Sequence, residues 1–166
     1  MNPVLEQMID RYACRTRNEY VSALREILQQ TALLGLWRSK FFEHAAFYGG
    51  TALRVLYGLD RYSEDLDFSL LEPDPSFVLG TYGDALQREL RSFGFEVSFE
   101  SRKRIRQSPI ESAFLKTNTL QLMIVVKATE SVTRMTHPGE ILKIRLEVDT
   151  DPPAGFETES RAVLLP

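Results

Sequence analysis

Apolar residues recur with helical spacing in two parts of the chain. The first stripe follows Asn18 and Glu19, which are typical of a helix start, and it predicts a helix that ends near Gly35. Its members are Val21, Leu24, Ile27, Leu28 and Leu34. The second stripe predicts an amphipathic helix that ends at Gly94. It consists of Leu79, Tyr82, Leu86, Leu90 and Phe93.

Between and after these helices the pattern changes to that of β-strands. Residues 45–48 form a short apolar run that meets Gly49-Gly50, and residues 51–57 form a helical sequence closed by Gly58. Residues 65–70 alternate polar and apolar side chains, as a half-buried strand does. Later strands are expected around Phe95, Val97 and Phe99, in an apolar run that ends near Val126, and over residues 141–149.

These elements predict a mixed α/β domain of the α+β type, in which helices flank a largely antiparallel sheet. The chain has 166 residues, of which 43% are hydrophobic and 26% are charged, so we expect one domain over residues 1–166. It divides into an N-terminal helical segment, 1–40, and a core, 41–166. The final residues, 163–165, form an apolar, strand-like run that is unusual for a chain end.

Charge and cysteine content narrow the class of protein. With 20 basic and 23 acidic residues the net charge is -3, which excludes binding of polyanions through the overall field. Cys14 is the sole cysteine, so the chain has no internal disulfide and no CxxC zinc motif. No apolar run approaches the roughly 18 residues that span a bilayer, and the amino terminus does not resemble a signal peptide. We expect a cytoplasmic protein without a membrane partner.

Candidate chemistry begins with two aspartates in the predicted strand 65–70. Asp65 and Asp67 are two residues apart, so both point to one face while Leu66 and Phe68 enter the core. Two carboxylates this close repel each other unless cations lie between them, and Mg²⁺ or Mn²⁺ prefers such oxygen ligands. The pair is a candidate metal site. The alternative is an ordinary solvated strand face, which also produces Asp-x-Asp.

Gly49, Gly50 and Thr51 add a candidate anion site at the turn between the predicted strand and helix. Backbone amides without side chains and a helix N-terminus favour phosphate, and the Thr51 hydroxyl can cap the helix or contact a phosphate. An ordinary N-cap after a tight turn is the alternative. A phosphate cradle beside metal-binding carboxylates is typical of phosphoryl or nucleotidyl transfer.

The strand predicted at 141–149 supplies a third carboxylate. Its apolar residues alternate with Lys143, Arg145, Glu147 and Asp149, which share one face. If this strand lies beside residues 65–70, Glu147 reaches the same metal, and Lys143 and Arg145 neutralise phosphate charge. Glu147 is preferred to Asp149 because Asp149 lies where the strand ends. A solvated, charge-balanced strand is the alternative.

Three further features have two interpretations each. Arg54 and Arg61 flank the candidate site and reach either phosphates or nearby carboxylates. The basic cluster at residues 102–106 is either a solvated loop or a local contact for RNA. His137 precedes a Pro-Gly turn, and we favour a structural role because no Ser-His-Asp or Cys-His arrangement can be assembled around it.

Two runs of residues resemble a known family. Residues 47–54, Phe-Tyr-Gly-Gly-Thr-Ala-Leu-Arg, and residues 61–68, Arg-Tyr-Ser-Glu-Asp-Leu-Asp-Phe, are similar to the motif of the AbiEii/AbiGii toxin family. That family belongs to the DNA polymerase beta-like nucleotidyltransferase superfamily. Residues 143–153 resemble the family's strand with the third carboxylate, and the similarity extends from about Phe41 to the end of the chain.

The resemblance implies a nucleotidyltransferase-like fold and metal-dependent transfer of a nucleotide from a nucleoside triphosphate, with tRNA an acceptor for some members. It also implies the toxin component of a bacterial toxin-antitoxin or abortive infection system, with an antitoxin as partner. Asp65, Asp67 and Glu147 become the catalytic residues and the ligands of Mg²⁺ or Mn²⁺. The implied nucleotide- and phosphate-binding residues are Gly49, Gly50, Thr51, Arg54, Arg61, Ser63, Lys143 and Arg145.

The chain departs from this resemblance at its end. Members of the family continue past the equivalent of residues 164–166 into a helical region that contributes to activity, which this sequence lacks. We therefore expect a truncated catalytic core, and we retain as alternative a catalytically weak remnant that binds a nucleotide or an antitoxin. A glycosyltransferase, which also uses Asp-x-Asp, is ranked last because only 64 residues precede Asp65.

Overall fold

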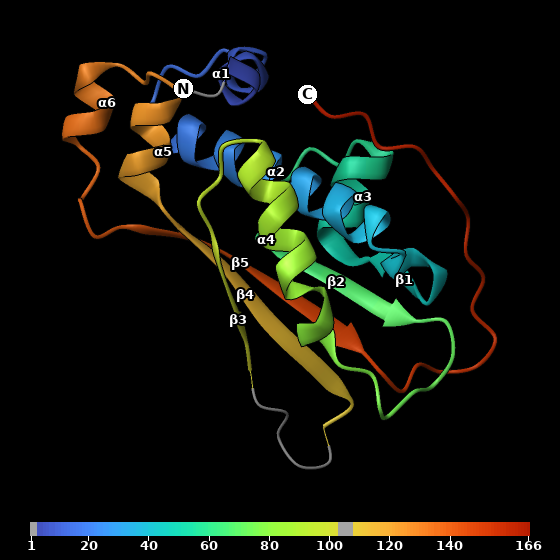
Figure 1. Ribbon diagram of the computed structural model, residues 1–166. Helices are drawn as coiled ribbons and strands as arrows, with labels where there is room; N and C mark the ends of the chain where they lie inside the picture. Colours follow the sequence, from blue (N-terminus) through green and yellow to red (C-terminus); the bar gives the residue numbers. More distant parts are fainter. Residues whose placement is uncertain (1–2, 103–107) are drawn as a thin grey trace.

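The computed structural model describes residues 3–102 and 108–166, in which one five-stranded sheet packs against helices (Figure 1). The α-helices are α1 (Pro3–Asp10), α2 (Arg17–Arg38), α3 (Gly49–Tyr57), α4 (Gly83–Ser92), α5 (Thr119–Val125) and α6 (Glu130–Arg134). The strands are β1 (Ala45–Tyr48), β2 (Asp65–Leu70), β3 (Ser98–Ser101), β4 (Ile110–Asn118) and β5 (Ile141–Asp149). Short 3₁₀ turns, η1 (Phe41–Glu43) and η2 (Leu79–Tyr82), precede β1 and α4.

The sheet has the strand order β1-β2-β5-β4-β3. β2 and β5 are parallel, whereas the other three neighbouring pairs are antiparallel. The predicted mixed α/β class and the largely antiparallel sheet are therefore confirmed. The parallel pair at the centre requires a long connection between β2 and β5, and this connection supplies α4, β3, β4, α5 and α6.

Alternation along the central strands separates a covered face of the sheet from a partly exposed face. In β2, Leu66, Phe68 and Leu70 are buried, and the alternate residues are half-buried. The same alternation occurs along β5. The covered side chains join apolar residues of α1, α2 and α4 in one core, with α2 and α4 lying across the sheet (Figure 1). Each Leu or Phe buried there contributes roughly 1.5 to 3 kcal/mol.

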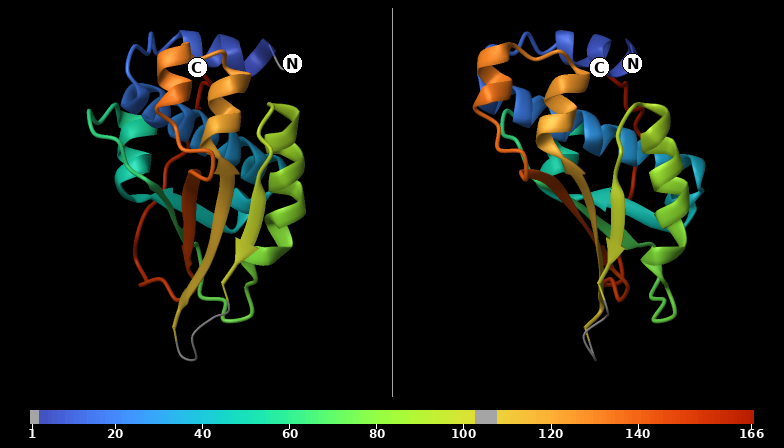
Figure 2. Two further views of the ribbon diagram at one scale, coloured as in Figure 1. Left: turned by 90° about the vertical axis from the view of Figure 1, so that its left-hand side faces the viewer. Right: turned by 60° about the vertical axis from the view of Figure 1, so that its left-hand side comes forward.

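One predicted strand is wrong. The apolar run that ends near Val126 does not continue a strand, because β4 ends at Asn118 and residues 119–125 form α5. The Asn118 side-chain oxygen accepts a hydrogen bond of 2.9 Å from the Gln121 amide, which is the geometry of a helix N-cap. Leu122 and Met123 then enter the core from a helix rather than from a strand. α5 and α6 lie together at one end of the sheet (Figure 2).

The boundaries of two predicted helices also differ. α2 begins after Thr16, which forms a capping box with Glu19, and it continues past Gly35 to Arg38. Gly35 is a packing residue: a Cβ there would lie 3.2 Å from the Cβ of Glu89 in α4. The helix predicted over the stripe that begins at Leu79 is divided into η2 and α4.

The remaining differences concern strands. β3 begins at Ser98, so Phe95 and Val97 are buried before the strand rather than within it. Residues 163–165 form no strand. The tail that contains them contacts the end of α3. Tyr57 donates a hydrogen bond to Glu159, and the Arg161 guanidinium lies 4.1 Å from the centre of the Tyr57 ring.

Within residues 3–102 and 108–166, none of the helices is both long enough and apolar enough to cross a membrane.

Candidate functional site

β2 and β5 bring the three predicted carboxylates to the partly exposed face of the sheet. In the parallel register Asp67 lies beside Glu147, and Asp65 lies beside Arg145. Neighbouring strands are about 4.8 Å apart, so the backbones of Asp67 and Glu147 are direct neighbours. The strand pairing on which a role for Glu147 depends is therefore present. Asp65, Asp67 and Glu147 are called the acidic trio below.

Arg145 lies within the acidic trio. Its Nη2 is 2.6 Å from Oδ2 of Asp65, and its Nη1 is 3.3 Å from Oε1 of Glu147. The hydrogen bond to Asp65, together with the charges of the trio, raises the pKa of Arg145, so this residue is a permanent cation. In the described part of the chain no three His, Cys, Asp or Glu side chains are arranged as a ready metal-binding group. The positive charge beside the trio comes from Arg145.

Asp67 is half-buried on the partly exposed face of the sheet. Burial raises its pKa above the ordinary value, and the negative charges of Asp65 and Glu147 raise it further. The backbone of Gly49 lies against this carboxylate: a Cβ on Gly49 would be 2.6 Å from Oδ2 of Asp67. Gly49 also has φ +82°, a conformation that glycine adopts without strain. Position 49 therefore requires glycine for both conformation and space.

The N-terminus of α3 begins at this same point. Tyr48 is its N-cap residue and makes no side-chain capping hydrogen bond, so the first-turn amides are available to an anion. Ser63 and Arg61 lie beside this turn, because a Cβ on Gly50 would be 3.2 Å from the Ser63 Oγ and 3.9 Å from the Arg61 Nη2. Gly49, Gly50, Ser63 and Arg61 are thus brought together next to Asp67.

Thr51 and Arg54, by contrast, contact protein groups. The buried Thr51 hydroxyl donates a hydrogen bond to the backbone carbonyl of Asp65, which fixes α3 to β2 rather than capping the helix. Arg54 Nε and Nη2 lie 3.0 and 2.9 Å from one carboxylate oxygen of Glu26 in α2. The Arg54 guanidinium also lies 3.8 Å from the centre of the Tyr62 ring. The structure therefore shows both side chains in structural contacts.

The two other predicted basic groups lie further along the sheet. Lys143 is on the same face of β5 as Arg145 and Glu147, with Nζ 4.9 Å from the centre of the Phe114 ring. Arg102, the first residue of the basic cluster, lies 4.8 Å from the same ring. Lys103, Arg104 and Arg106 of that cluster lie outside the described residues.

His137 accepts a hydrogen bond of 3.0 Å from the Gly139 amide, within its turn.

Sequence reasoning missed Tyr48 as a site residue. Tyr48 is the register partner of Asp67 across the β1–β2 pair, and its side chain is half exposed. Partial burial raises the pKa of its hydroxyl, and the charges of Asp67, Asp149 and Glu147 add to this effect. Tyr48 directly precedes Gly49-Gly50 in the sequence. This position at the end of a strand, beside the aspartates, could have identified Tyr48 as a site residue.

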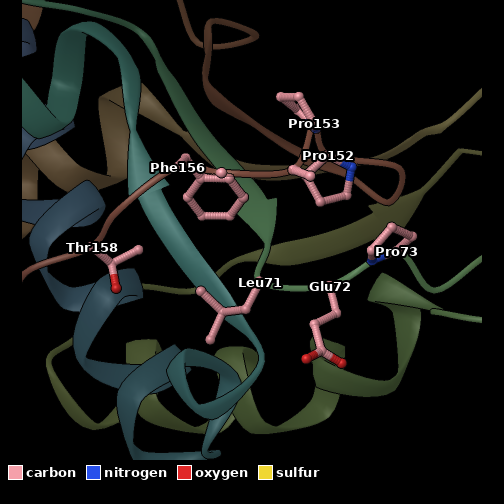
Figure 3. Close-up of a pocket in the computed structure, with 9 residues that line it drawn as sticks. Leu71, Glu72, Pro73, Pro152, Pro153, Phe156 and Thr158 are labelled. Carbon is pink, nitrogen blue, oxygen red and sulfur yellow. The ribbon is translucent and has the colours of Figure 1, made fainter.

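A cavity of about 490 Å³ lies elsewhere, between the segment after β2 and the segment after β5 (Figure 3). Glu72 is the one charged residue among those that line it, and none of the predicted site residues lines it. The lining residues are Leu71, Glu72, Pro73, Pro152, Pro153, Ala154, Gly155, Phe156 and Thr158. The acidic trio lies on an open surface of the sheet and not in this cavity.

Comparisons with known proteins identify relatives of this chain. Residues 31–164 match the family described as "Nucleotidyl transferase AbiEii toxin, Type IV TA system". Two solved structures from Helicobacter pylori are similar: JHP933, with 19% identity and a TM-score of 0.49, and a protein provisionally described as a nucleotidyltransferase, with 19% identity and a TM-score of 0.42. The matches cover 86% and 80% of this chain but 49% and 47% of those proteins, so it spans about half their length. No curated protein matches the chain.

Proposed function

Because the chain belongs to the AbiEii nucleotidyltransferase toxin family of type IV toxin-antitoxin systems, we propose that it transfers a nucleotide from a nucleoside triphosphate to an acceptor hydroxyl. The supporting observation is the register that places Asp67 beside Glu147, with Asp65 on the same face and the N-terminus of α3 adjacent. This arrangement combines carboxylates with an anion-binding helix terminus, as transfer from a triphosphate requires.

The chemistry of the acidic trio fits a divalent cation with oxygen ligands, Mg²⁺ or Mn²⁺. Burial is the main cause of the raised pKa of Asp67, and repulsion from Asp65 and Glu147, which a bound cation relieves, adds to it. Asp65, Asp67 and Glu147 would hold the cation once the Arg145 guanidinium moves away from Asp65 and Glu147. When bound, the cation supplies Lewis-acid stabilisation of the charge on the reacting phosphate oxygens.

The protein groups then divide the remaining work. The amides at Gly49 and Gly50 bind triphosphate oxygens at the start of α3, and Arg61 and Ser63 lie close enough to assist. Lys143 and the displaced Arg145 offset phosphate charge along β5. The acceptor oxygen bonds to the α-phosphorus, the bond from that phosphorus to the bridging oxygen breaks, and pyrophosphate leaves. A carboxylate of the trio takes the hydroxyl proton.

tRNA is the acceptor class that we propose to test first, and the family assignment also supports an antitoxin protein as partner. The experiment incubates the purified chain with each α-labelled nucleoside triphosphate and tRNA, in Mg²⁺, in Mn²⁺ or in chelator. We expect label transfer that depends on the metal and is lost in Asp67→Asn. Asp84→Asn, an exposed carboxylate on α4, is the matched control.

Thermal unfolding of the same samples separates an enzyme from a remnant. A ligand bound only by the folded state raises the melting temperature by mass action. A nucleotide- and metal-dependent rise without any transfer would favour the catalytically weak remnant. If neither transfer nor a rise occurs with any triphosphate, the proposal is wrong.

A further inference from the structure

Three cationic side chains surround one aromatic ring on the partly exposed face of the sheet. The Arg102 guanidinium, the Lys143 Nζ and the Lys116 Nζ lie 4.8, 4.9 and 5.8 Å from the centre of the Phe114 ring. Phe114 is only 9% exposed. These four residues, which come from β4, β5 and the residue after β3, are called the Phe114 cluster below.

The register of the sheet places the Phe114 cluster directly beside the acidic trio. Phe114 is the partner of Arg145 across the β4–β5 pair, and Arg145 is the partner of Asp65 across the β2–β5 pair. Lys116 and Lys143 are partners in the next row. Strands about 4.8 Å apart therefore put the backbone of Phe114, two strands from β2, about 10 Å from that of Asp65 on the same surface.

The charge of the Phe114 cluster is largely unneutralised. Lys116 pairs with Glu100. Within residues 3–102 and 108–166, Arg102 and Lys143 form no ion pair with a carboxylate. With Glu100 the cluster has three cations and one anion, so the cluster itself carries excess positive charge beside the acidic trio. The aromatic ring offsets part of their repulsion through cation–π attraction, and an anion would offset more.

We propose that the Phe114 cluster binds the phosphate backbone of a single-stranded nucleic acid and so guides its end to the acidic trio. Part of this inference, the delivery to the carboxylates, rests on the proposed function; the binding itself does not. A row of cations on one sheet face suits the successive phosphates of a single strand, whereas a duplex presents two backbones around a stiff helix. The neighbouring carboxylates repel phosphates, so the strand is directed along β3 to β5 rather than across β2.

The test is fluorescence anisotropy with a labelled single-stranded RNA of roughly 12 nucleotides, without triphosphate or divalent metal. We expect Lys143→Gln and Arg102→Gln each to weaken binding of all sequences and to lower the slope of log affinity against log salt by about 0.7. Arg91→Gln removes an exposed cation from α4 on the other face of the sheet. It is expected to leave the affinity for RNA and the salt slope unchanged. Melting temperatures establish that each variant is folded.

Two results would overturn the proposal. One is equal affinity and equal salt slope in the parent, Lys143→Gln and Arg102→Gln; the other is tighter binding of a duplex of the same sequence. Asp67→Asn separates this proposal from the proposed function, because it removes a catalytic carboxylate and leaves the Phe114 cluster intact. RNA binding that depends on the Phe114 cluster supports the inference even where the parent chain transfers no nucleotide.

Discussion

Arg145 donates a hydrogen bond of 2.6 Å to Asp65, its register partner on the neighbouring parallel strand. Because the same guanidinium also reaches Glu147, the acidic trio already has one cation in the absence of any ligand. If the trio binds a divalent metal as proposed, that metal and Arg145 compete for the same carboxylates. The competition gives the first prediction.

Arg145→Gln is expected to lower the melting temperature in chelator, since three carboxylates then repel one another without an internal cation. Mg²⁺ or Mn²⁺ alone should raise the melting temperature of the variant more than that of the parent. Differential scanning fluorimetry across a metal titration measures both effects. Arg91→Gln serves as control, and an equal metal-induced rise in parent and variant would contradict the competition.

Gly49→Ala is expected to be much more damaging than Gly50→Ala. A residue with a Cβ at φ +82° costs roughly 1 to 2 kcal/mol, and the new Cβ at 2.6 Å must also displace the Asp67 carboxylate. At Gly50 the Cβ meets the Ser63 Oγ at 3.2 Å and the backbone needs no left-handed conformation. Urea unfolding of the two variants measures the difference. Equal losses would show that the Asp67 contact is unimportant.

Arg54→Met should destabilise the fold by about 3 kcal/mol, because it leaves the Glu26 carboxylate unpaired between α2 and α3. The side chains of Arg54 and Glu26 are only 18% and 11% exposed, so water replaces the lost partner poorly. Adding Glu26→Leu should restore part of the loss, and chemical denaturation of the double-mutant cycle measures the coupling. Additive effects of the two substitutions would refute a direct pair.

Glu19→Gln tests the capping box at the start of α2 by its dependence on pH. Amide hydrogen bonds from Arg15 and Thr16 lower the pKa of Glu19 below its ordinary value of 4.5. A carboxyl group whose pKa is lower in the folded state than in the unfolded chain stabilises the fold at pH values above its unfolded-state pKa. This stabilisation is lost as the pH falls through its folded-state pKa. The variant should therefore melt below the parent at neutral pH, and the two should converge in acid. A difference that is independent of pH would exclude the charge as its source.

Local sequence patterns were sufficient to predict much of the fold and to identify the three residues of the acidic trio. Alternation in β2 and β5 placed Asp65, Asp67 and Glu147 on exposed faces because a strand with one covered face must alternate. The glycine pair marked the start of α3 because position 49 needs a positive φ. The period of apolar residues and the backbone conformation of a turn depend on a few consecutive residues, so both can be predicted from the sequence.

Interactions between distant segments were not predictable in the same way. The apolar run at residues 119–125 has no decisive period, and the choice of helix depends on the Asn118 cap and on packing against α2. Arg54 has carboxylates close in sequence, yet it pairs with Glu26, 28 residues away. Phe114 gains its cations from three separate segments. The short helices α1 and α6 lack a repeated apolar stripe long enough to reveal them.

The parallel pairing of β2 with β5 also determines when the acidic trio can exist. Asp65 and Arg145 are 80 residues apart in sequence, and the strand that carries Glu147 joins β2 only after the intervening segment has been made. Contacts of such long range form slowly and late in folding. A nascent chain on the ribosome therefore displays both aspartates but lacks their third partner until β5 has emerged. This order delays assembly of the proposed catalytic centre until residues 141–149 have been synthesised.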